Sequence, residues 1–264
     1  VVGYVDDTSK IRTRSTGGLA GRYKLLLQFG TAILLCSWLY YGDTWLPSDW
    51  LEIRHRLAAP FFAFSKYPIE LPPWLYVIFS SFVIVGTSNA VNLTDGLDGL
   101  AIGPVMISAG TYAILAYLAG LTLFGNVVAG YLDIPHIQSA GELSIFAGSV
   151  VGVGFGFLWY NTYPAQVFMG DVGSLALGGG LGALAVLTKN ELLSIILGGI
   201  FVVEAVSVIV QVGYFRLTGR RIFLMAPIHH HFEKKGWPEP RVIVRFWIIA
   251  IMLAVFSLAT LKLR

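Results

Sequence analysis

The chain is poor in charged residues and almost free of cysteine. Only 12% of its 264 residues are charged, whereas a soluble domain carries roughly 25%. Its single cysteine, Cys36, excludes an intrachain disulfide. Apolar and polar residues do not alternate along the hydrophobic stretches, which argues against a membrane β-barrel. The composition therefore predicts a helical integral membrane protein.

The sequence is rich in long apolar runs. Its mean hydropathy is +0.72. Crossing a bilayer as a helix takes ~20 apolar residues. Seven runs meet or approach that length: 25–41, 74–91, 100–124, 143–160, 172–187, 192–213 and 242–261. We predict an all-α polytopic bundle, a single membrane domain over residues 1–264. Residues 1–5 look like the end of an earlier helix, so we expect N-terminal helices to be missing. The glycines at 152–156 and 178–180 are interpreted as helix-packing faces.

Counting crossings places the loops on two sides of the membrane. One side receives the loops at about 6–24, 92–99, 161–171 and 214–241. With Arg245 assigned to it, that side holds twelve of the eighteen lysines and arginines. Because cytoplasmic loops are enriched in these residues, we predict that this side is cytoplasmic.

Five of the eight aspartates stand where apolar runs end, all on the predicted cytoplasmic side. They are Asp6, Asp7, Asp95, Asp98 and Asp171. A charged group near hydrocarbon is costly, ~3 kcal/mol or more at the bilayer centre. An acidic cluster at one face therefore suggests a site for a metal and an anionic substrate. Each aspartate alone is also compatible with a helix cap or a surface ion pair.

Two motifs gather polar residues between apolar runs. The first, at 89–100, holds two asparagines and two acids within ten residues, where the second apolar run ends and the third begins: Asn89, Asn92, Asp95 and Asp98. The second, at 161–174, places Asp171 at a helix start between Gly170 and Gly173. Carboxylates there suit Mg²⁺, which prefers oxygen ligands and shares them with substrate phosphates. Phe168 could stack on a base or anchor at the membrane interface.

The last predicted cytoplasmic loop contains three adjacent histidines, His229, His230 and His231. They cannot all face one way, and no cysteine is near enough to complete a zinc site. The basic residues around them suit either substrate phosphate or anionic lipid. Within the sixth run, Glu204 and Gln211 lie seven residues apart on one helical face. An acid inside a membrane span is a functional hypothesis by default.

Together these segments resemble the polyprenyl-phosphate N-acetylhexosamine-1-phosphate transferases. The resemblance covers essentially the whole chain through four ordered motifs, at 3–7, 89–100, 161–174 and 227–241. The Pro-Ile-His-His-His stretch at 227–231 favours the branch that transfers a phospho-N-acetylmuramoyl-pentapeptide. The family also carries upstream helices and a lysine-bearing loop, so the activity of this chain by itself stays open.

The resemblance implies a reaction of peptidoglycan synthesis. A UDP-N-acetylmuramoyl-pentapeptide and undecaprenyl phosphate would give lipid I and UMP, with Mg²⁺, at the cytoplasmic face of a bacterial inner membrane. Partners would be these substrates and membrane lipid, without nucleic acid. The oligomeric state stays open, a homodimer included.

The resemblance also assigns roles. Asp171 would bind Mg²⁺, and Asp6 or Asp7 would take a proton from the polyprenyl phosphate or orient it. A covalent aspartyl intermediate is the alternative to that one-step route. The uridine end would be held by Asp95, Asp98, Asn161 and Phe168. Phosphate or sugar would meet Lys24, His229, His230 and His231, and the weaker candidates for the site wall are Asn89, Asn92 and Gln211.

Three other functions remain open from sequence. A sibling transferase would use UDP-N-acetylglucosamine as donor. An ion-coupled secondary transporter would place Glu204, Gln211 and the glycine-rich spans around a midplane site. A noncatalytic membrane scaffold would tolerate loss of all five aspartates.

Overall fold

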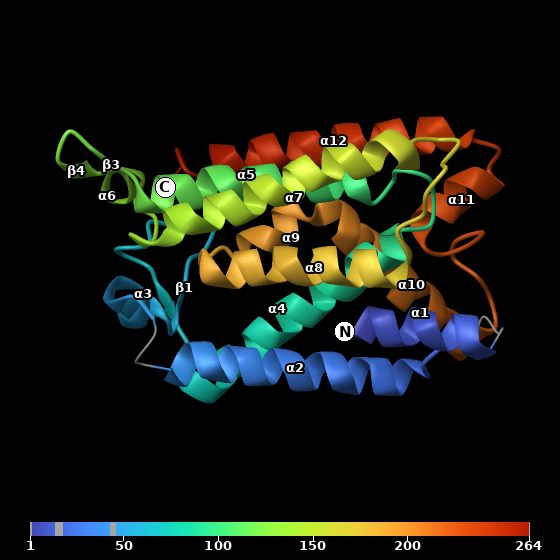
Figure 1. Cartoon of the computed structure of the whole chain (residues 1–264), viewed down its shortest axis with the longest axis horizontal. Helices are drawn as coiled ribbons and strands as arrows, with labels where there is room; N and C mark the ends of the chain where they lie inside the picture. The colour runs from blue at the N-terminus through green and yellow to red at the C-terminus, as the bar shows by residue number, and fades with distance from the viewer. Residues whose placement is uncertain (1, 14–17, 43–45, 264) are drawn as a thin grey trace.

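The computed structural model describes residues 2–13, 18–42 and 46–263, and its long helices run side by side along the longest axis of the molecule (Figure 1). Seven of the described helices are long and apolar enough to cross a membrane. They are α2 (Gly21–Tyr41), α4 (Pro73–Thr94), α5 (Ile102–Gly120), α7 (Ala140–Asn161), α8 (Gly170–Leu187), α10 (Gly199–Thr218) and α12 (Glu239–Ala259). The predicted seven-span, all-α membrane protein is confirmed.

Most of the short elements lie at the two ends of the bundle (Figure 1). At one end lie α1 (Val2–Thr13) and α11 (Ile228–Lys234). At the other end lie α3 (Ser48–Ile53), α6 (Val128–Leu132) and two antiparallel hairpins, β1 (Arg56–Leu57) with β2 (Ile69–Glu70) and β3 (Thr122–Leu123) with β4 (Asn126–Val127). Their registers pair Arg56 with Glu70 and Thr122 with Val127. The four loops predicted to share a side therefore meet at the end that holds α1 and α11.

Two helix boundaries differ from the prediction. Helix α1 does not end at Asp6 and Asp7 but continues through them to Thr13. Lys10, one turn after Asp6, forms an ion pair with it, and such i,i+4 pairs stabilise a helix. The sixth apolar run is interrupted at Gly198, which separates the short α9 (Leu193–Leu197) from α10. At the far end of α10, Gly219 adopts a left-handed φ of 70° and stops the helix.

Close packing of α8 on α4 sets the position of the acidic residue at the start of α8. A Cβ added to Gly178 would lie 2.7 Å from the Cα of Ser88, and one on Gly182 would lie 2.7 Å from the Cα of Ile84. Only glycine allows the backbones to approach this far. The packing role predicted for Gly178 is confirmed. In the 152–156 stretch of α7 it is confirmed for Gly154, where an added Cβ would lie 2.4 Å from Cγ of Met106, but not for Gly152 and Gly156, which meet nothing within 4 Å.

Candidate active site

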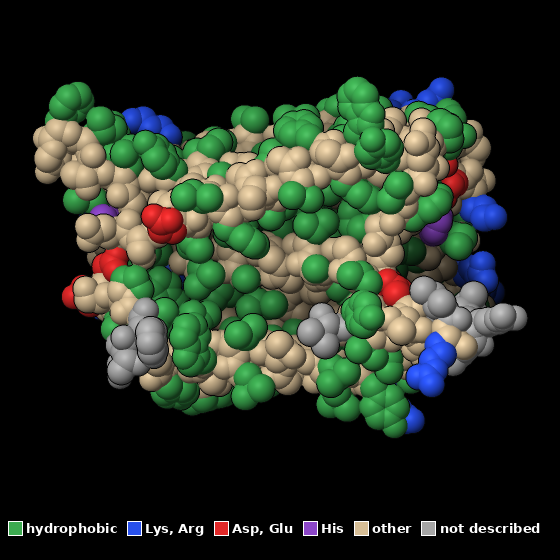
Figure 2. All heavy atoms as spheres, viewed as in Figure 1, with side chains coloured by type: hydrophobic (Ala, Val, Ile, Leu, Met, Phe, Trp, Pro, Cys, Tyr) green, Lys and Arg blue, Asp and Glu red, His purple; other side chains and the backbone are tan. Residues whose placement is uncertain are grey.

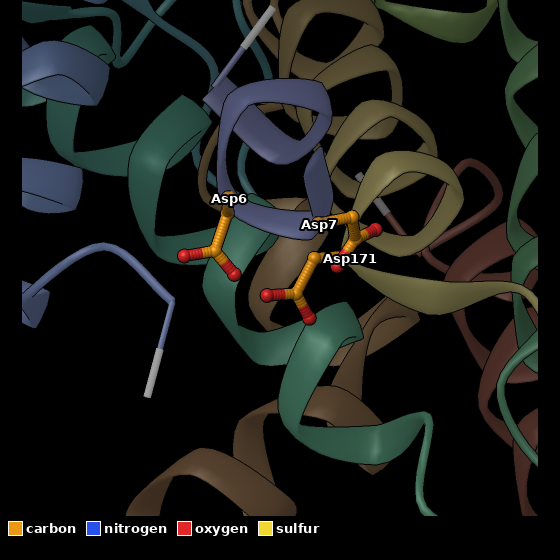
Figure 3. Close-up of side chains that lie close together, drawn as sticks. All are labelled: Asp6, Asp7 and Asp171. Carbon is orange, nitrogen blue, oxygen red and sulfur yellow. The ribbon is translucent and has the colours of Figure 1, made fainter. Parts of the chain in front are cut away.

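Three carboxylates converge where α1 meets the first turn of α8 (Figure 3). Asp6 and Asp7 come from α1 and Asp171 from α8, and each offers an oxygen within 4.8 Å of the other two. The side chain of Asp6 is almost wholly buried, with 1% exposed. Like charges this close repel one another, so the cluster needs cations to balance it.

Two lysine ammonium groups supply that balance. The Nζ of Lys10 lies 2.7 Å from Asp6, 2.8 Å from Asp171 and 3.2 Å from Asp7. The Nζ of Lys24 lies 2.8 Å from Asp171 and 3.2 Å from Asp6. Burial lowers the pKa of Lys10, but its hydrogen bonds to Asp171, Asp6 and Asp7 outweigh burial and raise that pKa, so Lys10 stays charged. Sequence reasoning found Lys24 and missed Lys10, although the spacing of Lys10 from Asp6 and Asp7 on one helix was a usable signal.

Neutral donors fix the orientation of the same carboxylates. The side-chain amide of Asn92 donates to Oδ1 of Asp171 at 2.8 Å. The backbone N–H of Leu19 donates to Oδ1 of Asp6 at 2.7 Å, and that of Val172 donates to Oδ2 of Asp7 at 3.0 Å. The cluster is therefore held in place from α1, α4, α8 and the segment that precedes α2.

The donor set fits a hard divalent cation. Carboxylate oxygens are the ligands that such ions prefer, and three separate carboxylates lie close enough to share one ion. The same oxygens contact Lys10 and Lys24, so an ion that binds there must compete with two ammonium groups.

A cavity of about 320 Å³ adjoins this acidic cluster. Its lining includes Asp171 and residues of both predicted motifs: Asn92, Asp95, Gly96, Leu97, Asp98, Asn161, Phe168, Met169 and Gly170. Burial, together with the nearby charge of Asp171, raises the pKa of Asp95 to about 6. The ring of Phe168 is 73% exposed, so it is free to pack against a ligand. The structure thus brings the nucleotide-side candidates together beside the metal candidates.

Hydrogen bonds hold the cavity wall. Asp98 accepts from the backbone N–H of Ala165 at 2.8 Å, and its own N–H donates to Oε1 of Glu239 at 2.9 Å. Asn161 accepts from the N–H of Gly99 at 3.0 Å. Glu239 was missed by sequence reasoning, because an acid in the first turn of a span reads as an ordinary helix-dipole partner.

The three histidines point to different partners, as predicted. His229 is fully buried, with Nδ1 3.1 Å from Oε2 of Glu204. Nδ1 of His230 lies 2.5 Å from Oε2 of Glu233. His231 accepts from the backbone N–H of Leu224 at 3.0 Å. None of the three lines the cavity beside the cluster, so their contact with phosphate or sugar stays a prediction.

Two weaker candidates lie outside that cavity. Asn89 donates to the side chain of Gln28 at 2.7 Å. Gln211 accepts from the backbone N–H groups of Ile222 and Phe223 and lines a separate groove of about 530 Å³. Both side chains organise neighbouring backbone or helices, and their place in the site wall remains a prediction.

Comparison with known proteins gives one consistent result. The sequence profile of glycosyl transferase family 4 matches residues 1–189. A phospho-N-acetylmuramoyl-pentapeptide-transferase of Sorangium cellulosum (strain So ce56) is 68% identical over 264 residues, which are 100% of this chain and 70% of that protein. The proteins of the same name from Anaeromyxobacter sp. strains Fw109-5 and K are 54% and 52% identical, over all of this chain and 71% of their own lengths.

Proposed function

The chain belongs to glycosyl transferase family 4 and, within it, to the phospho-N-acetylmuramoyl-pentapeptide-transferases, and we propose that its acidic cluster and the adjoining cavity form the active site of that reaction. The enzyme transfers phospho-N-acetylmuramoyl-pentapeptide from its UDP-linked donor to undecaprenyl phosphate. The products are lipid I, a precursor of peptidoglycan, and UMP.

One observation carries the assignment of the site. Carboxylates from α1 and α8 converge within 4.8 Å, and the cavity that shares Asp171 with them gathers the other predicted residues. A cluster of carboxylates beside a cavity lined by polar side chains fits a metal-dependent transfer from a nucleoside diphosphate.

The chemistry explains why cations are concentrated here. An oxygen of the acceptor phosphate attacks the sugar-linked phosphorus of the donor, and the bond from that phosphorus to the bridging oxygen breaks as UMP leaves. Both reactants are anions, and two unit charges ~4 Å apart repel by about 4 kcal/mol at an effective dielectric near 20. Bound Mg²⁺, held by Asp171, would neutralise diphosphate charge. Lys10 and Lys24 lie 2.8 Å from Asp171 and can shift from it to the phosphates.

Asp6 and Asp7 act on the acceptor. Both lie within one turn of the lysine that pairs with Asp171, so an acceptor phosphate at the cluster would contact them. Either carboxylate would receive the acceptor proton or orient the attacking oxygen. A covalent aspartyl intermediate uses the same residues, and the two routes differ in whether a phosphoryl-enzyme accumulates without acceptor.

The uridine end of the donor occupies the cavity. Asp95 and Asp98 supply acceptors for base or ribose groups, Asn161 fixes their loop, and the exposed ring of Phe168 stacks on the base. The hydrocarbon chain of the acceptor enters from the other side. There an apolar groove of about 320 Å³, between α1, α2, α4 and α8, includes Gly3 and Val172 beside the acidic cluster.

The site faces the cytoplasm in this proposal. Figure 2 shows Lys and Arg side chains gathered at the end of the bundle that carries α1 and α11, with fewer at the opposite end. The positive-inside rule then orients the site toward the cytoplasmic side of a bacterial inner membrane, where nucleotide-linked donors are made.

The decisive assay uses the full-length protein in detergent, with UDP-N-acetylmuramoyl-pentapeptide, undecaprenyl phosphate and Mg²⁺. UMP and a lipid-linked product should appear in equal amounts. UDP-N-acetylglucosamine should neither replace the donor nor compete with it. Turnover of UDP-N-acetylglucosamine alone would assign the sibling activity, and flux across vesicles without UMP release would assign a carrier.

Matched variants locate the reaction at the cluster. Asp6→Asn and Asp7→Asn should each slow UMP release, whereas Glu142→Gln, an exposed carboxyl at the start of α7, should not. If both cluster variants keep the wild-type rate, the role proposed for these two residues fails.

A further inference from the structure

Two buried polar side chains, Glu204 and His229, lie next to the cavity and take no part in the chemistry described so far. Glu204 of α10 and His229 of α11 each have 0% exposed side chains, and Oε2 of Glu204 lies 3.1 Å from Nδ1 of His229. Within the described part of the chain, neither carboxylate oxygen of Glu204 and neither ring nitrogen of His229 makes a hydrogen bond, so the two side chains meet at ion-pair distance only. Burying such groups is costly unless they are paired, and polar groups inside a span usually serve function.

The Nε2–Cε1 edge of the His229 ring lies against Gly96, in the loop that lines the cavity. A Cβ added to Gly96 would lie 2.3 Å from Nε2 of His229 and 2.9 Å from its Cε1. The backbone φ of Gly96 is not in the left-handed region, so the neighbouring ring, rather than the backbone conformation, is what requires glycine there. Gly96 directly follows Asp95 and is itself part of the cavity lining.

The two halves of this loop are therefore held differently. Asp98 and Gly99 are fixed by hydrogen bonds with Ala165, Glu239 and Asn161. The half that contains Gly96 rests against the ring of His229. Nδ1 of that ring faces the carboxylate of Glu204. The carboxylate therefore orients the ring so that Nε2 faces the loop at Gly96.

We propose that Glu204 is a positioning residue for donor recognition, acting through His229 to hold the Asp95–Gly96 end of the loop against the nucleotide. The inference rests on the proposed function, since it takes the cavity to be the donor site. It assigns Glu204 to binding of the nucleotide end and leaves the metal and acceptor steps to the acidic cluster.

The test compares steady-state kinetics of UMP release in Glu204→Leu and Glu204→Gln. Leucine places no polar atom beside Nδ1 of His229, whereas glutamine keeps an amide group there. We expect Glu204→Leu to raise the KM for the UDP-linked donor roughly tenfold or more, as loss of a carboxylate that orients a histidine does at metal sites. Glu204→Gln should recover most of that loss. The KM for undecaprenyl phosphate and the Mg²⁺ concentration at half-maximal rate should stay within about twofold in both.

A matched control separates positioning from general damage to α10. Ser207→Ala removes a buried hydroxyl one turn away on the same helix. It should leave the donor KM unchanged. A melting temperature lowered in Glu204→Leu with an unchanged donor KM would show a merely structural role and overturn the inference.

A double-mutant cycle tests the contact even if Glu204→Leu fails to fold. Gly96→Ala should raise the donor KM in the wild-type background, because its new methyl group meets the His229 ring. In the His229→Ala background the same substitution should have little further effect. Equal effects of Gly96→Ala in both backgrounds would overturn the inference. Absence of UMP release by the wild-type protein would instead refute the proposed function.

Discussion

Replacing Lys10 with methionine removes one of the two cations that balance the acidic cluster while keeping a similar side-chain length. Its ammonium contacts Asp6, Asp7 and Asp171 at 2.7–3.2 Å. At 2.7 Å and an effective dielectric near 20, one such pair is worth about 6 kcal/mol before solvation is counted. Removing one partner of a buried pair costs about 3–5 kcal/mol, and an exposed pair contributes about 0–1. Lys10 is 33% exposed and Asp6 is buried, so we expect a net loss of about 2 kcal/mol.

The loss of stability in Lys10→Met should be larger without a divalent cation than with one. Without Mg²⁺, Lys10→Met leaves three carboxylates facing one remaining ammonium, and the melting temperature should fall by roughly 4–8 °C. With Mg²⁺ the variant should recover, because the ion no longer competes with Lys10 for the same oxygens. A ligand at a hundred times its Kd adds about 2.7 kcal/mol of stability. The stabilisation by Mg²⁺ should therefore be larger in Lys10→Met than in the wild-type protein.

The assay is a melting curve of the detergent-solubilised protein, in chelator and across a Mg²⁺ titration. Lys66→Met is the matched control, because Lys66 is exposed and lies between the strands of the hairpin at the opposite end of the bundle. It should match the wild-type protein in both conditions. A Lys10→Met variant whose Mg²⁺ shift equals or falls below the wild-type shift would refute the competition between ammonium and metal.

Three further predictions concern the cavity and the packing that places it. Because folding raises the pKa of Asp95 from 3.8 to about 6, stability from this group is greatest below 3.8 and is lost as the pH rises through about 6. Donor binding needs the carboxylate, so the donor KM should rise below about pH 6, and Asp95→Asn should flatten that profile. Glu239→Gln, which weakens the acceptor for the N–H of Asp98, should raise the donor KM by a few-fold without changing the Mg²⁺ dependence. Gly182→Val should lower the melting temperature by several degrees through overpacking on α4, whereas Gly152→Val in open space should not.

Much of the fold was predictable because a bilayer imposes length and apolarity on each span. The seven spans follow from these constraints alone. Helix α1 was predicted too short, since Asp6 and Asp7 look like the end of an apolar run, and only their pairing with Lys10 shows that the helix continues. The interruption at Gly198 was hidden within a run of continuous apolar residues.

The site was predictable in its parts and less so in its contacts. Membrane parity put Asp6, Asp7 and Asp171 at one face, and they meet there. Counting membrane crossings assigns a residue to a side of the membrane but gives no distances. It could not predict that His229 lies buried against Gly96, or that Glu239 accepts a hydrogen bond from Asp98, 141 residues away in the sequence. Such contacts depend on how helices pack, which a single sequence does not encode locally.

The most direct test of the central claim is the Mg²⁺ dependence of UMP release in Asp171→Asn. Asp171 belongs to the acidic cluster and also lines the cavity, so both halves of the proposed site depend on it. We predict a loss of at least a hundredfold at limiting Mg²⁺, partly recovered when Mg²⁺ is raised, with the Glu142→Gln control unaffected. Near-wild-type UMP release by Asp171→Asn at limiting Mg²⁺ would contradict the account.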